Sequence, residues 1–434
     1  MTVVIYFSAP VKAEPKIWTV DDDGPADFQT IQEAINAATS GDTIFVYSGT
    51  YQEWNIVLAE DNLSLIGENR DTTIIDGGSV YYWILIIAAQ NVTVTGFTIQ
   101  NSPVGTAGIF LDHAMKSKIS NNIIKNHDSG IYALFSNENI IENNWVANNN
   151  EGIILSTGCK ENKIRGNNVT GNTHPVFGGG IDLTNGARNN EVENNNIIQN
   201  KYGIIISHEN NSIFGNQIIN NDVGIYEYSE STRGYKIFHN NFINNTRQVD
   251  LGNLSVNAWD NGVEGNYWSD YDGTDFNQDG IGDAPYIING NNTDCNPLMG
   301  TFSDFTVAWE ERAYHVTTIC NSTISAFQFD QVNKVIRFNV TGEEGTLSFC
   351  RISIPKALMN YTSYTVLVDG NEPTLQKDLP CSNSTHEYLY FTYIHSTHEI
   401  TITTEFPTLA VMLLVFVVLT IAVTIYKHRF PKRH

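Results

Sequence analysis

The sequence predicts an all-β protein whose largest part is a parallel β-helix, a solenoid in which each coil stacks on the one before. Gly-Ile pairs recur at a nearly constant interval, starting at Gly108, Gly130, Gly152, Gly180, Gly203 and Gly224. Successive starts are 22, 22, 28, 23 and 21 residues apart, a period too short for helix pairs and typical of stacked β units. Apolar residues alternate after each glycine, as at Ile109 and Leu111, which is the pattern of strands with one buried face.

Asparagines mark a second repeated position in each coil. An Asn-x-x-x-Asn pair precedes the next Gly-Ile, and its second members are Asn126, Asn148, Asn172, Asn200, Asn220 and Asn244. We predict that these six residues occupy equivalent corners and form a ladder of side-chain amide hydrogen bonds along the solenoid. The alternative, that they only mark exposed polar turns, explains the residue type but not the fixed interval.

The two ends of the solenoid have their own patterns. Residues 14–41 are predicted to cap the first coil, because Ile31, Ala34, Ile35 and Ala38 share one face of an amphipathic helix. The solenoid is expected over residues 42–251, and residues 252–300 form a closing segment. Residues 301–404 alternate apolar and polar side chains between turn signals, which predicts a small β-sandwich that acts as a stalk.

Three stretches resemble a known family: TIQEAINAATSGDTIFVYSGTY at residues 30–51, the Asn/Gly-Ile coils, and GNYWSDYDGTDFNQDGIGDAPY at residues 265–286. They resemble the right-handed parallel β-helix proteins grouped with NosD and with carbohydrate-binding and sugar-hydrolysis (pectin-lyase-like) domains, especially archaeal cell-surface members. The resemblance covers roughly two thirds of the chain. It implies a right-handed solenoid and two classes of function, carbohydrate recognition and copper delivery to a reductase.

Copper delivery is the less expected of these two functions. Copper sites favour clusters of Met, Cys and His, whereas Met115, Met299 and Met359 are dispersed along the chain. The net charge of -23 also argues against nucleic acid as a partner, because phosphate binding needs a basic face.

The chain ends suggest export and anchoring. Residues 1–13 resemble the end of a signal peptide. Thr408–Tyr426 is uncharged and long enough for one transmembrane helix, and the basic residues 427–434 after it predict a cytoplasmic C-terminus with the bulk of the chain outside the cell. Asn-x-Ser/Thr sequons, Asn168 among them, agree with that location. The five cysteines are too few for a disulfide framework, although one bridge among the last three is compatible with it.

Residues 275–283, DFNQDGIGD, match the first nine positions of a calcium loop, with a glycine at the sharp turn. The ligands that this match assigns are Asp275, Asn277, Asp279, the backbone carbonyl of Ile281, and Asp283. Tyr286 stands where such loops carry a bidentate glutamate. We predict a structural calcium ion that locks the C-terminal end of the solenoid; the alternative is an acidic turn without an ion.

Outward-facing side chains after each Gly-Ile glycine are candidates for a ligand-binding face. Aromatic rings and scattered polar groups suit a sugar polymer, and the candidates are Asp112, His113, Tyr132, Asp182, His208 and Tyr226. The long coil at residues 171–180 is expected to wall such a groove. Ordinary surface decoration of a solenoid is the alternative.

Catalysis is left open by the sequence. A glycosidase needs two carboxyl groups about 5 to 10 Å apart, but Asp112 and Asp182 lie three coils, or roughly 14 Å, apart. Glu227 is an unusual carboxylate at an inward position. The sequence therefore predicts a membrane-anchored cell-surface protein that binds extracellular glycan or envelope polymer. The alternatives are a polysaccharide-cleaving lyase or glycosidase of the same fold, and a structural or adhesive envelope protein.

Overall fold

The computed structural model describes residues 14–404, apart from 79, 177, 230–231 and 360–362. The predicted signal peptide, the transmembrane helix at 408–426 and the basic tail lie outside the described residues. In the part that is described, no helix combines the length and hydrophobicity that a membrane span requires. The chain divides into two compact units: unit 1 runs to Gly273 and includes Asp283–Pro297, while unit 2 comprises Thr274–Gly282 and the chain from Leu298 on.

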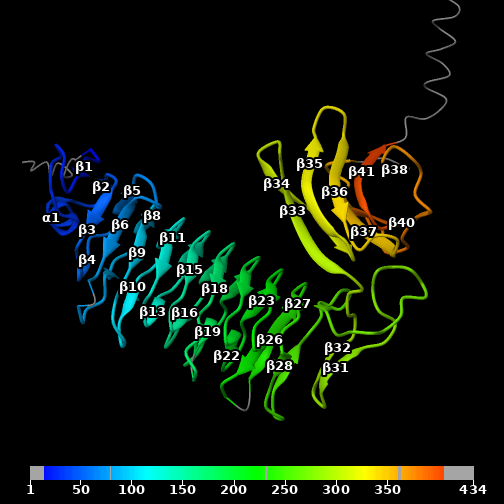
Figure 1. Ribbon diagram of the computed structural model, residues 1–434, viewed down its shortest axis with the longest axis horizontal. Coiled ribbons are helices and arrows are strands. Elements are labelled where there is room, and N and C mark those ends of the chain that lie inside the picture. Colours follow the sequence, from blue (N-terminus) through cyan, green and yellow to red (C-terminus); the bar gives the residue numbers. More distant parts are fainter. Residues whose placement is uncertain (1–13, 79, 177, 230–231, 360–362, 405–434) are drawn as a thin grey trace, which may run out of the picture. The chain divides into compact units, whose positions relative to one another are not determined.

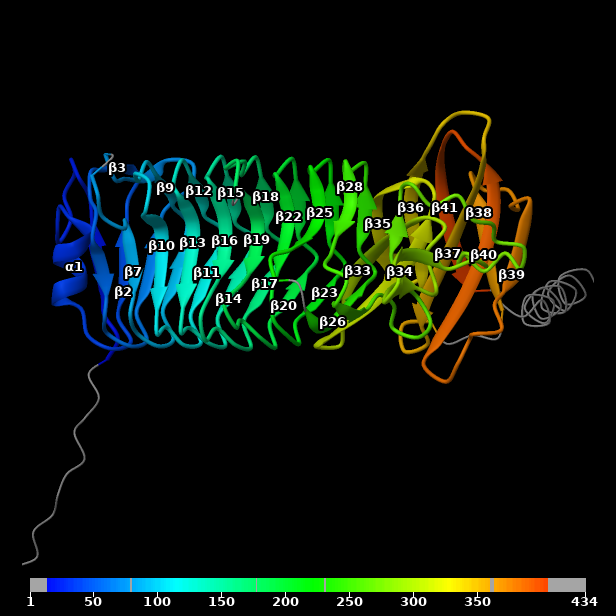
Figure 2. The same ribbon diagram turned by 90° about the horizontal axis from the view of Figure 1, so that it is seen from below.

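Unit 1 is the predicted all-β solenoid, built from three parallel sheets that share its coils (Figures 1 and 2). Sheet A contains β1 (Ile17–Val20), β2 (Thr43–Val46), β5 (Ser64–Gly67), β8 (Thr93–Thr95), β11 (Lys118–Ser120), β14 (Ile140–Glu142), β17 (Lys163–Arg165), β20 (Glu191–Glu193), β23 (Ser212–Phe214), β26 (Arg233–Phe238) and β29 (Val256–Ala258).

Sheets B and C complete each coil. Sheet B contains β3 (Gly49–Tyr51), β6 (Thr73–Asp76), β9 (Thr98–Gln100), β12 (Ile123–Lys125), β15 (Trp145–Ala147), β18 (Asn168–Thr170), β21 (Asn196–Ile198), β24 (Gln217–Ile219), β27 (Asn241–Ile243) and β30 (Tyr267–Trp268). Sheet C contains β4 (Ile56–Leu58), β7 (Leu85–Ile87), β10 (Ala107–Asp112), β13 (Ser129–Leu134), β16 (Glu151–Leu155), β19 (Gly179–Leu183), β22 (Tyr202–Ile206), β25 (Val223–Glu227) and β28 (Arg247–Asp250).

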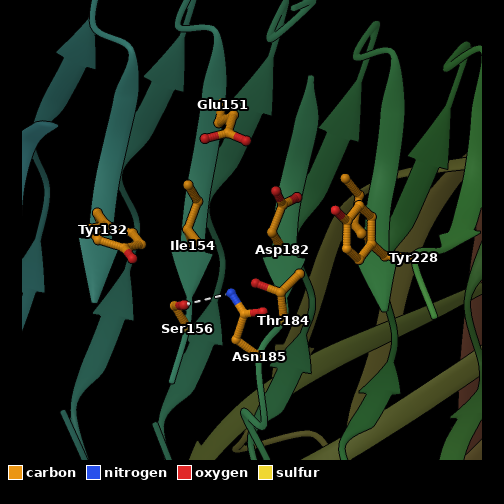
Figure 3. A pocket seen from close by; sticks show the side chains of 9 residues that line it. Tyr132, Glu151, Ile154, Ser156, Asp182, Thr184, Asn185 and Tyr228 are labelled. Carbon is orange, nitrogen blue, oxygen red and sulfur yellow. Dashed lines mark hydrogen bonds between the residues drawn. The ribbon is translucent and has the colours of Figure 1, made fainter. Parts of the chain in front are cut away.

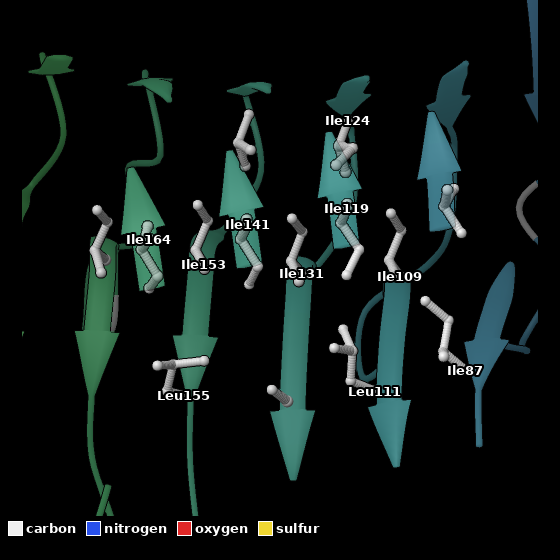
Figure 4. Packing of buried hydrophobic residues seen from close by; sticks show 14 of the residues in the cluster. Ile87, Ile109, Leu111, Ile119, Ile124, Ile131, Ile141, Ile153, Leu155 and Ile164 are labelled. Carbon is white, nitrogen blue, oxygen red and sulfur yellow. The ribbon is translucent and has the colours of Figure 1, made fainter. Parts of the chain in front are cut away.

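The interior of the solenoid is a continuous stack of aliphatic side chains (Figure 4). Ile109, Ile131, Ile153 and Ile181 pair successively along sheet C and are fully buried. Burying each such side chain contributes roughly 1.5–3 kcal/mol, and only a parallel, in-register stack places all of them in one core.

The first coil is covered by α1 (Ile31–Ala37), which buries Ile31, Ala34 and Ile35. Thr30 caps the helix by accepting a hydrogen bond from the Glu33 backbone N–H. The apolar face therefore closes the N-terminal end of the core.

Buried polar ladders run along the three corners of the coils. The corner between sheets A and B holds Asn122, Asn144, Asn167, Asn195, Asn216, Asn240 and Asn266. The corner between sheets C and A holds Asn139, Asn162, Asn190 and Asn211. The corner between sheets B and C holds His127, Asn149, Asn172, Asn200, Asn221 and Asn245. Each Oδ1 accepts the backbone N–H of the preceding coil, so these interior turns are satisfied without water.

The predicted position of the ladder needs a correction. Asn172 and Asn200 belong to it, but Asn126, Asn148, Asn220 and Asn244 are exposed and lie one residue before it. These four adopt the left-handed backbone conformation, with φ between 52° and 62°. Asparagine tolerates that conformation at a tight corner better than most residues do, so these four asparagines shape the turn and their neighbours form the ladder.

The last coil is closed by an aromatic cluster. Trp259 and Trp268 are almost completely buried, and Tyr286 stacks on Trp268 with ring centroids 4.3 Å apart. A short hairpin of β31 (Tyr286–Asn289) and β32 (Asn292–Asp294) carries Asp294, which accepts the Trp268 indole N–H at 2.9 Å. The cluster covers the apolar core at this end.

Unit 2 is built from two antiparallel sheets. One contains β33 (Thr301–Trp309), β34 (Arg312–Cys320), β37 (Leu347–Pro355), β40 (His386–Ile394) and β39 (Leu375–Asp378). The other contains β35 (Thr323–Asp330), β36 (Val335–Thr341), β41 (Thr397–Thr404) and β38 (Tyr364–Val368). Both sheets bury apolar side chains in one core, for example Ile352 and Ile400.

Candidate functional site

The outer face of sheet C carries one column of side chains in strict register. Phe110, Tyr132, Ile154, Asp182, Ile205 and Tyr226 pair successively from β10 to β25. At about 4.8 Å per coil, Tyr132 and Tyr226 are roughly 19 Å apart, with Asp182 midway between them.

A hollow of about 230 Å³ opens on this face around Asp182. Figure 3 shows its side chains, which neighbouring coils contribute. Its lining residues are Tyr132, Glu151, Ile154, Ser156, Asp182, Thr184, Asn185, Ile205 and Tyr228. The hollow therefore joins two acidic groups, three short polar side chains and two phenol rings.

Asp182 lies at the floor of the hollow and is only 4% exposed. Its Oδ1 has no hydrogen-bond partner among the described residues. Burial raises the pKa of this carboxyl well above its usual range, and the nearby charge of Glu151 raises it further. Burial therefore favours the protonated form of Asp182 over the ionised form when the hollow is empty.

Gly179 makes room for the Asp182 carboxyl. A Cβ built at this glycine would lie 1.7 Å from the Asp182 Oδ1, so any larger residue would displace the acid. Gly179 follows directly on the long corner that begins at Gly171. This coil therefore supplies space for the acid.

Glu151 is the second acid of the site, and the sequence prediction missed it. Ile153 pairs with Ile181 and Ile154 with Asp182, so the same register places Glu151 opposite Gly179 on the neighbouring coil. Burial is the main cause that raises the pKa of Glu151 to about 7, and the Asp128 charge adds to it. The Ser129 hydroxyl, which donates to Glu151 Oε2 at 3.3 Å, opposes this shift.

The two carboxyl groups belong to one hollow. The Asp182 Oδ1 lies over Gly179, and the backbone of Gly179 is one coil spacing, about 4.8 Å, from that of Glu151. Both acids line the hollow, and the Glu151 charge raises the pKa of Asp182. Raised pKa values also suit a group that donates a proton near neutral pH.

Aromatic and hydroxyl groups frame the acids. Tyr228 is 59% exposed and Tyr132 is half-buried on the other side of the hollow. The Asn185 side-chain N–H donates to Ser156 Oγ at 3.1 Å, which fixes one edge of the site. Phenol rings offer apolar area with a polar tip, a combination that suits a sugar ring.

The remaining predicted ligand-face residues lie outside the hollow. Asp112 and His113 form an exposed pair at 2.6 Å. His208 is exposed and contacts Ser207, and Tyr226 stacks on the ring of Tyr202. Of the six candidates, the structure therefore brings only Tyr132 and Asp182 together.

The predicted calcium loop belongs to unit 2, apart from Asp283. Asp275 accepts hydrogen bonds from the backbone N–H groups of Asp279 and Gly280, each at 2.9 Å. Lys377 donates to the Asn277 carbonyl at 2.6 Å. Burial raises the pKa of Asp275. The loop is therefore linked to β39 in the first sheet of the sandwich through Lys377, and the calcium ion stays a prediction.

The remaining predicted ligands of the loop can be placed as well. Asp279 accepts the Ile281 backbone N–H at 2.9 Å, and Ile281 forms an antiparallel bridge with Leu298. Asp283 lies just beyond the loop, in the segment that the contacts assign to unit 1.

Comparison with known proteins places the chain in a family. Residues 35–273, more than half of the chain, match the family described as periplasmic copper-binding protein (NosD). The chain belongs to the NosD family. Two relatives are each described as a probable ABC transporter binding protein NosD. The one from Stutzerimonas stutzeri is 32% identical over 113 residues, which cover 24% of this chain and 26% of the relative.

The second relative, from Pseudomonas aeruginosa, is 37% identical over 81 residues, 19% of each chain. The chain thus spans about a quarter or less of the length of these two relatives. Both are bacterial, so the archaeal character that the sequence resemblance implied is not supported.

Solved β-helix structures resemble the solenoid. Pectate lyase Pel9A has a TM-score of 0.44 at 14% identity, covering 58% of this chain and 81% of its own. Alginate lyase from Paenibacillus sp. has a TM-score of 0.35 at 14% identity, covering 58% and 97%.

The copper in the family description can be tested against the donors of this chain. Among the described residues, the only group of three or more potential His, Cys, Asp or Glu ligands is Asp21, Asp22 and Asp23. These offer hard carboxylate oxygens, whereas copper prefers imidazole and sulfur. Met115 lies in the solenoid and Met359 in the core of the sandwich. The described residues therefore do not fit a copper centre.

Proposed function

We propose that this NosD-family protein binds a carbohydrate polymer along the outer face of sheet C, with the hollow around Asp182 as its central subsite. The observation that carries the proposal is Asp182 itself, a buried acid whose Oδ1 has no partner among the described residues. An unsatisfied buried polar atom costs about 1–3 kcal/mol, and a sugar hydroxyl in the hollow supplies the missing hydrogen bond.

The surroundings of Asp182 favour a sugar over other small ligands. Tyr132 and Tyr228 provide ring surfaces, and Ser156, Thr184 and Asn185 provide hydroxyl and amide groups at short intervals. A face with aromatic and polar groups in alternation recognises ligands that are themselves apolar on one side and hydroxylated at the edge.

The charge of the hollow supports an uncharged sugar in this subsite. The raised pKa of Asp182 and the Glu151 pKa of about 7 give the empty hollow less negative charge than two ordinary carboxylates would. Among the described residues no Lys or Arg lines the hollow, so none of them offers a cation to a uronate.

Cleavage of the glycan is the second candidate function, favoured by the proximity of Glu151 and Asp182. In that reaction the protonated acid transfers its proton to the glycosidic oxygen as the bond to the anomeric carbon breaks. The ionised acid then attacks that carbon directly or removes a proton from the attacking water. The products are a shortened chain and a new hemiacetal end.

The cellular setting is part of the proposal. We place the protein outside the cytoplasm, held by the predicted C-terminal helix, because the acidic, sequon-containing chain and the predicted signal peptide suit an exported protein. A calcium ion at Asp275–Asp283 is a structural addition to this proposal and takes no part in sugar binding.

The test is a panel of soluble neutral and acidic polysaccharides offered to the purified full chain, with binding measured by calorimetry and turnover by reducing-end assay. Asp182→Asn, Glu151→Gln and Tyr228→Ala are compared with Glu191→Gln on sheet A as the matched control. We expect Tyr228→Ala and Asp182→Asn to weaken binding at least tenfold, while Glu191→Gln has no effect.

Turnover separates the two candidates. New reducing ends that vanish in both Asp182→Asn and Glu151→Gln establish cleavage. Binding without turnover leaves a receptor or adhesin. If the hollow variants bind all polysaccharides as the wild type does, the proposed site is wrong.

A further inference from the structure

A second face of the solenoid, the outer side of sheet B, carries two regular columns of side chains. The column that starts at Trp145 continues through Asn168, Asn196 and Gln217, which pair successively from β15 to β24. We call these three residues the amide row. Two positions further along β18 lies Thr170, which pairs with Ile198 on β21; Ile198, Ile219 on β24 and Ile243 on β27 continue this column, and we call these three the aliphatic row.

The amide row lacks protein partners. No side-chain hydrogen bond of Asn168, Asn196 or Gln217 is formed within the described part of the chain, in contrast to the interior asparagines, which are fully engaged in ladders. Asn168 is exposed, and the other two are half-exposed. One free amide per coil therefore faces outward, at intervals of about 4.8 Å.

The head of the row has an open aromatic side chain. Trp145 is 43% exposed, and a hollow of about 370 Å³ separates it from Arg70, with Asn143 and Asn168 at its edge. Arg70 forms no ion pair with a described residue. A flat indole beside a free guanidinium and an amide is a set of groups that stacks on, and donates to, a sugar ring.

Sheet A shows what an ordinary outer face of this solenoid looks like. Its charged side chains pair with one another across coils, for example Lys118 with Glu142 at 2.7 Å and Lys163 with Glu191 at 2.7 Å. These charged side chains on sheet A thus find partners within the protein, and the side chains of the amide row do not. The difference indicates that the amide row is available to bind a ligand.

We propose that the outer face of sheet B is a second carbohydrate-binding surface, which takes an uncharged polysaccharide lying along the solenoid axis. One coil spacing is close to the length of one pyranose unit, so each amide of the row meets a successive sugar. The aliphatic row lies against the apolar side of the rings, and Trp145 stacks on the sugar at one end.

The charge of the face selects this class of ligand. The amide and aliphatic rows contain no acid and no base over three coils, so an acidic polymer would lose its hydration there without gaining a counter-charge. Arg70 stands only at the end of the face and donates to one hydroxyl-bearing unit. This surface is separate from the Asp182 hollow, because it lies on a different sheet of each coil.

The experiment measures binding of soluble neutral polysaccharides, such as galactomannan and xyloglucan, and of polygalacturonate, to the full chain. The chain is made in a host without N-glycosylation, because Asn168 begins an Asn-Val-Thr sequon and an attached glycan would cover the face. The variants are Trp145→Ala and the double substitution Asn196→Ala with Gln217→Ala. Trp54→Ala is the control, because Trp54 is similarly exposed at 41% but lies away from this face. Thermal unfolding verifies that each variant is folded.

All variants are also made in the Asp182→Asn background, so that the two surfaces are scored separately. We expect Trp145→Ala and the double variant to weaken binding of a neutral polysaccharide at least fivefold in both backgrounds, while Trp54→Ala does not. The inference is overturned if no neutral polysaccharide binds in the Asp182→Asn background, or if Trp145→Ala matches Trp54→Ala. Binding of polygalacturonate alone, lost in Trp145→Ala, overturns the uncharged class.

Discussion

Two buried acids on sheet C differ in the hydrogen bonds that the rest of the chain donates to them. Glu227, at the end of β25, is 7% exposed and accepts hydrogen bonds from the backbone N–H groups of Thr232 and Gly252, each at 2.6 Å, and from the Ser255 hydroxyl. Asp182, two coils earlier, is 4% exposed, and its Oδ1 has no donor among the described residues.

This difference indicates that Glu227 is the structural acid of the two. Glu227 ties the last coils to the segment that closes the solenoid, because it accepts hydrogen bonds from donors on both. The Asp182 side chain links no other described segment by a hydrogen bond, and its burial is unfavourable for the unliganded protein. Residues that reduce stability in this way are concentrated at binding and catalytic sites.

The largest expected effect comes from Glu227→Gln, which preserves size but replaces one acceptor oxygen by a donor. The new amide N–H group faces N–H or O–H donors, and hydrogen bonds to a charged group contribute about 1.5–3 kcal/mol each. We expect the free energy of unfolding to fall by about 2–4 kcal/mol, measured by urea titration with circular dichroism. A loss below 0.5 kcal/mol would remove the contrast between the two acids.

The corresponding isosteric substitution at the other acid, Asp182→Asn, should raise the free energy of unfolding. The pKa of Asp182 is raised in the folded state, so the stability linked to its protonated form is present below the unfolded pKa of about 3.9 and is lost as the pH rises. We expect the variant to be more stable than the wild type by about 1–2 kcal/mol at pH 8, and nearly equal to it at pH 4. A variant that is less stable at pH 8 would show that Asp182 is structural.

A smaller effect is expected from Gly179→Ala, which sharpens the account of the hollow. The added methyl group displaces the Asp182 carboxyl and should cost about 1 kcal/mol, together with most of the sugar binding. In an Asp182→Ala background the cost should disappear, since the two side chains no longer compete. Equal costs in both backgrounds would mean that the glycine serves the backbone alone.

The smallest effect concerns Asp275, an acid intermediate between the two, since its oxygens accept backbone N–H groups but remain half-exposed. If calcium binds there as proposed, millimolar calcium should raise the melting temperature of unit 2 by a few degrees, by mass action. Magnesium is the control ion, and Asp275→Asn should abolish the shift. Identical melting curves with calcium and with chelator would leave an acidic turn without an ion.

The solenoid was predictable because its two periodicities can be counted directly in the amino-acid sequence. Alternation after each Gly-Ile pair defines the strands, and the 21- to 28-residue interval defines the coil. The ladder was placed one residue too early because Asn148, Asn220 and Asn244 are each followed by another asparagine. In two coils the left-handed corner residue is not an asparagine: these coils read Gly171-Asn172 and Gln199-Asn200. In these two coils the prediction therefore selected the ladder residue itself.

The candidate site was only half predictable. Asp182 was found by counting outward positions after each glycine, but Glu151 precedes its glycine and was not counted. The signal was nevertheless available, because equivalent residues in other coils, Ser129, Gly179 and Tyr202, are not acidic. Burial and the missing hydrogen bond, which distinguish Asp182 from Glu227, depend on three-dimensional packing that no periodicity reports.

The coil that carries the corner at residues 171–178 is longer than its neighbours, yet the strands on both sides remain paired residue for residue. Length can therefore change at this corner without disturbing the coils above or below. In evolutionary terms, insertions at this corner leave the fold unchanged, so selection can act on them to change ligand specificity. It is also the natural place to graft a foreign loop beside Asp182 when the recognition properties of this solenoid are to be redesigned.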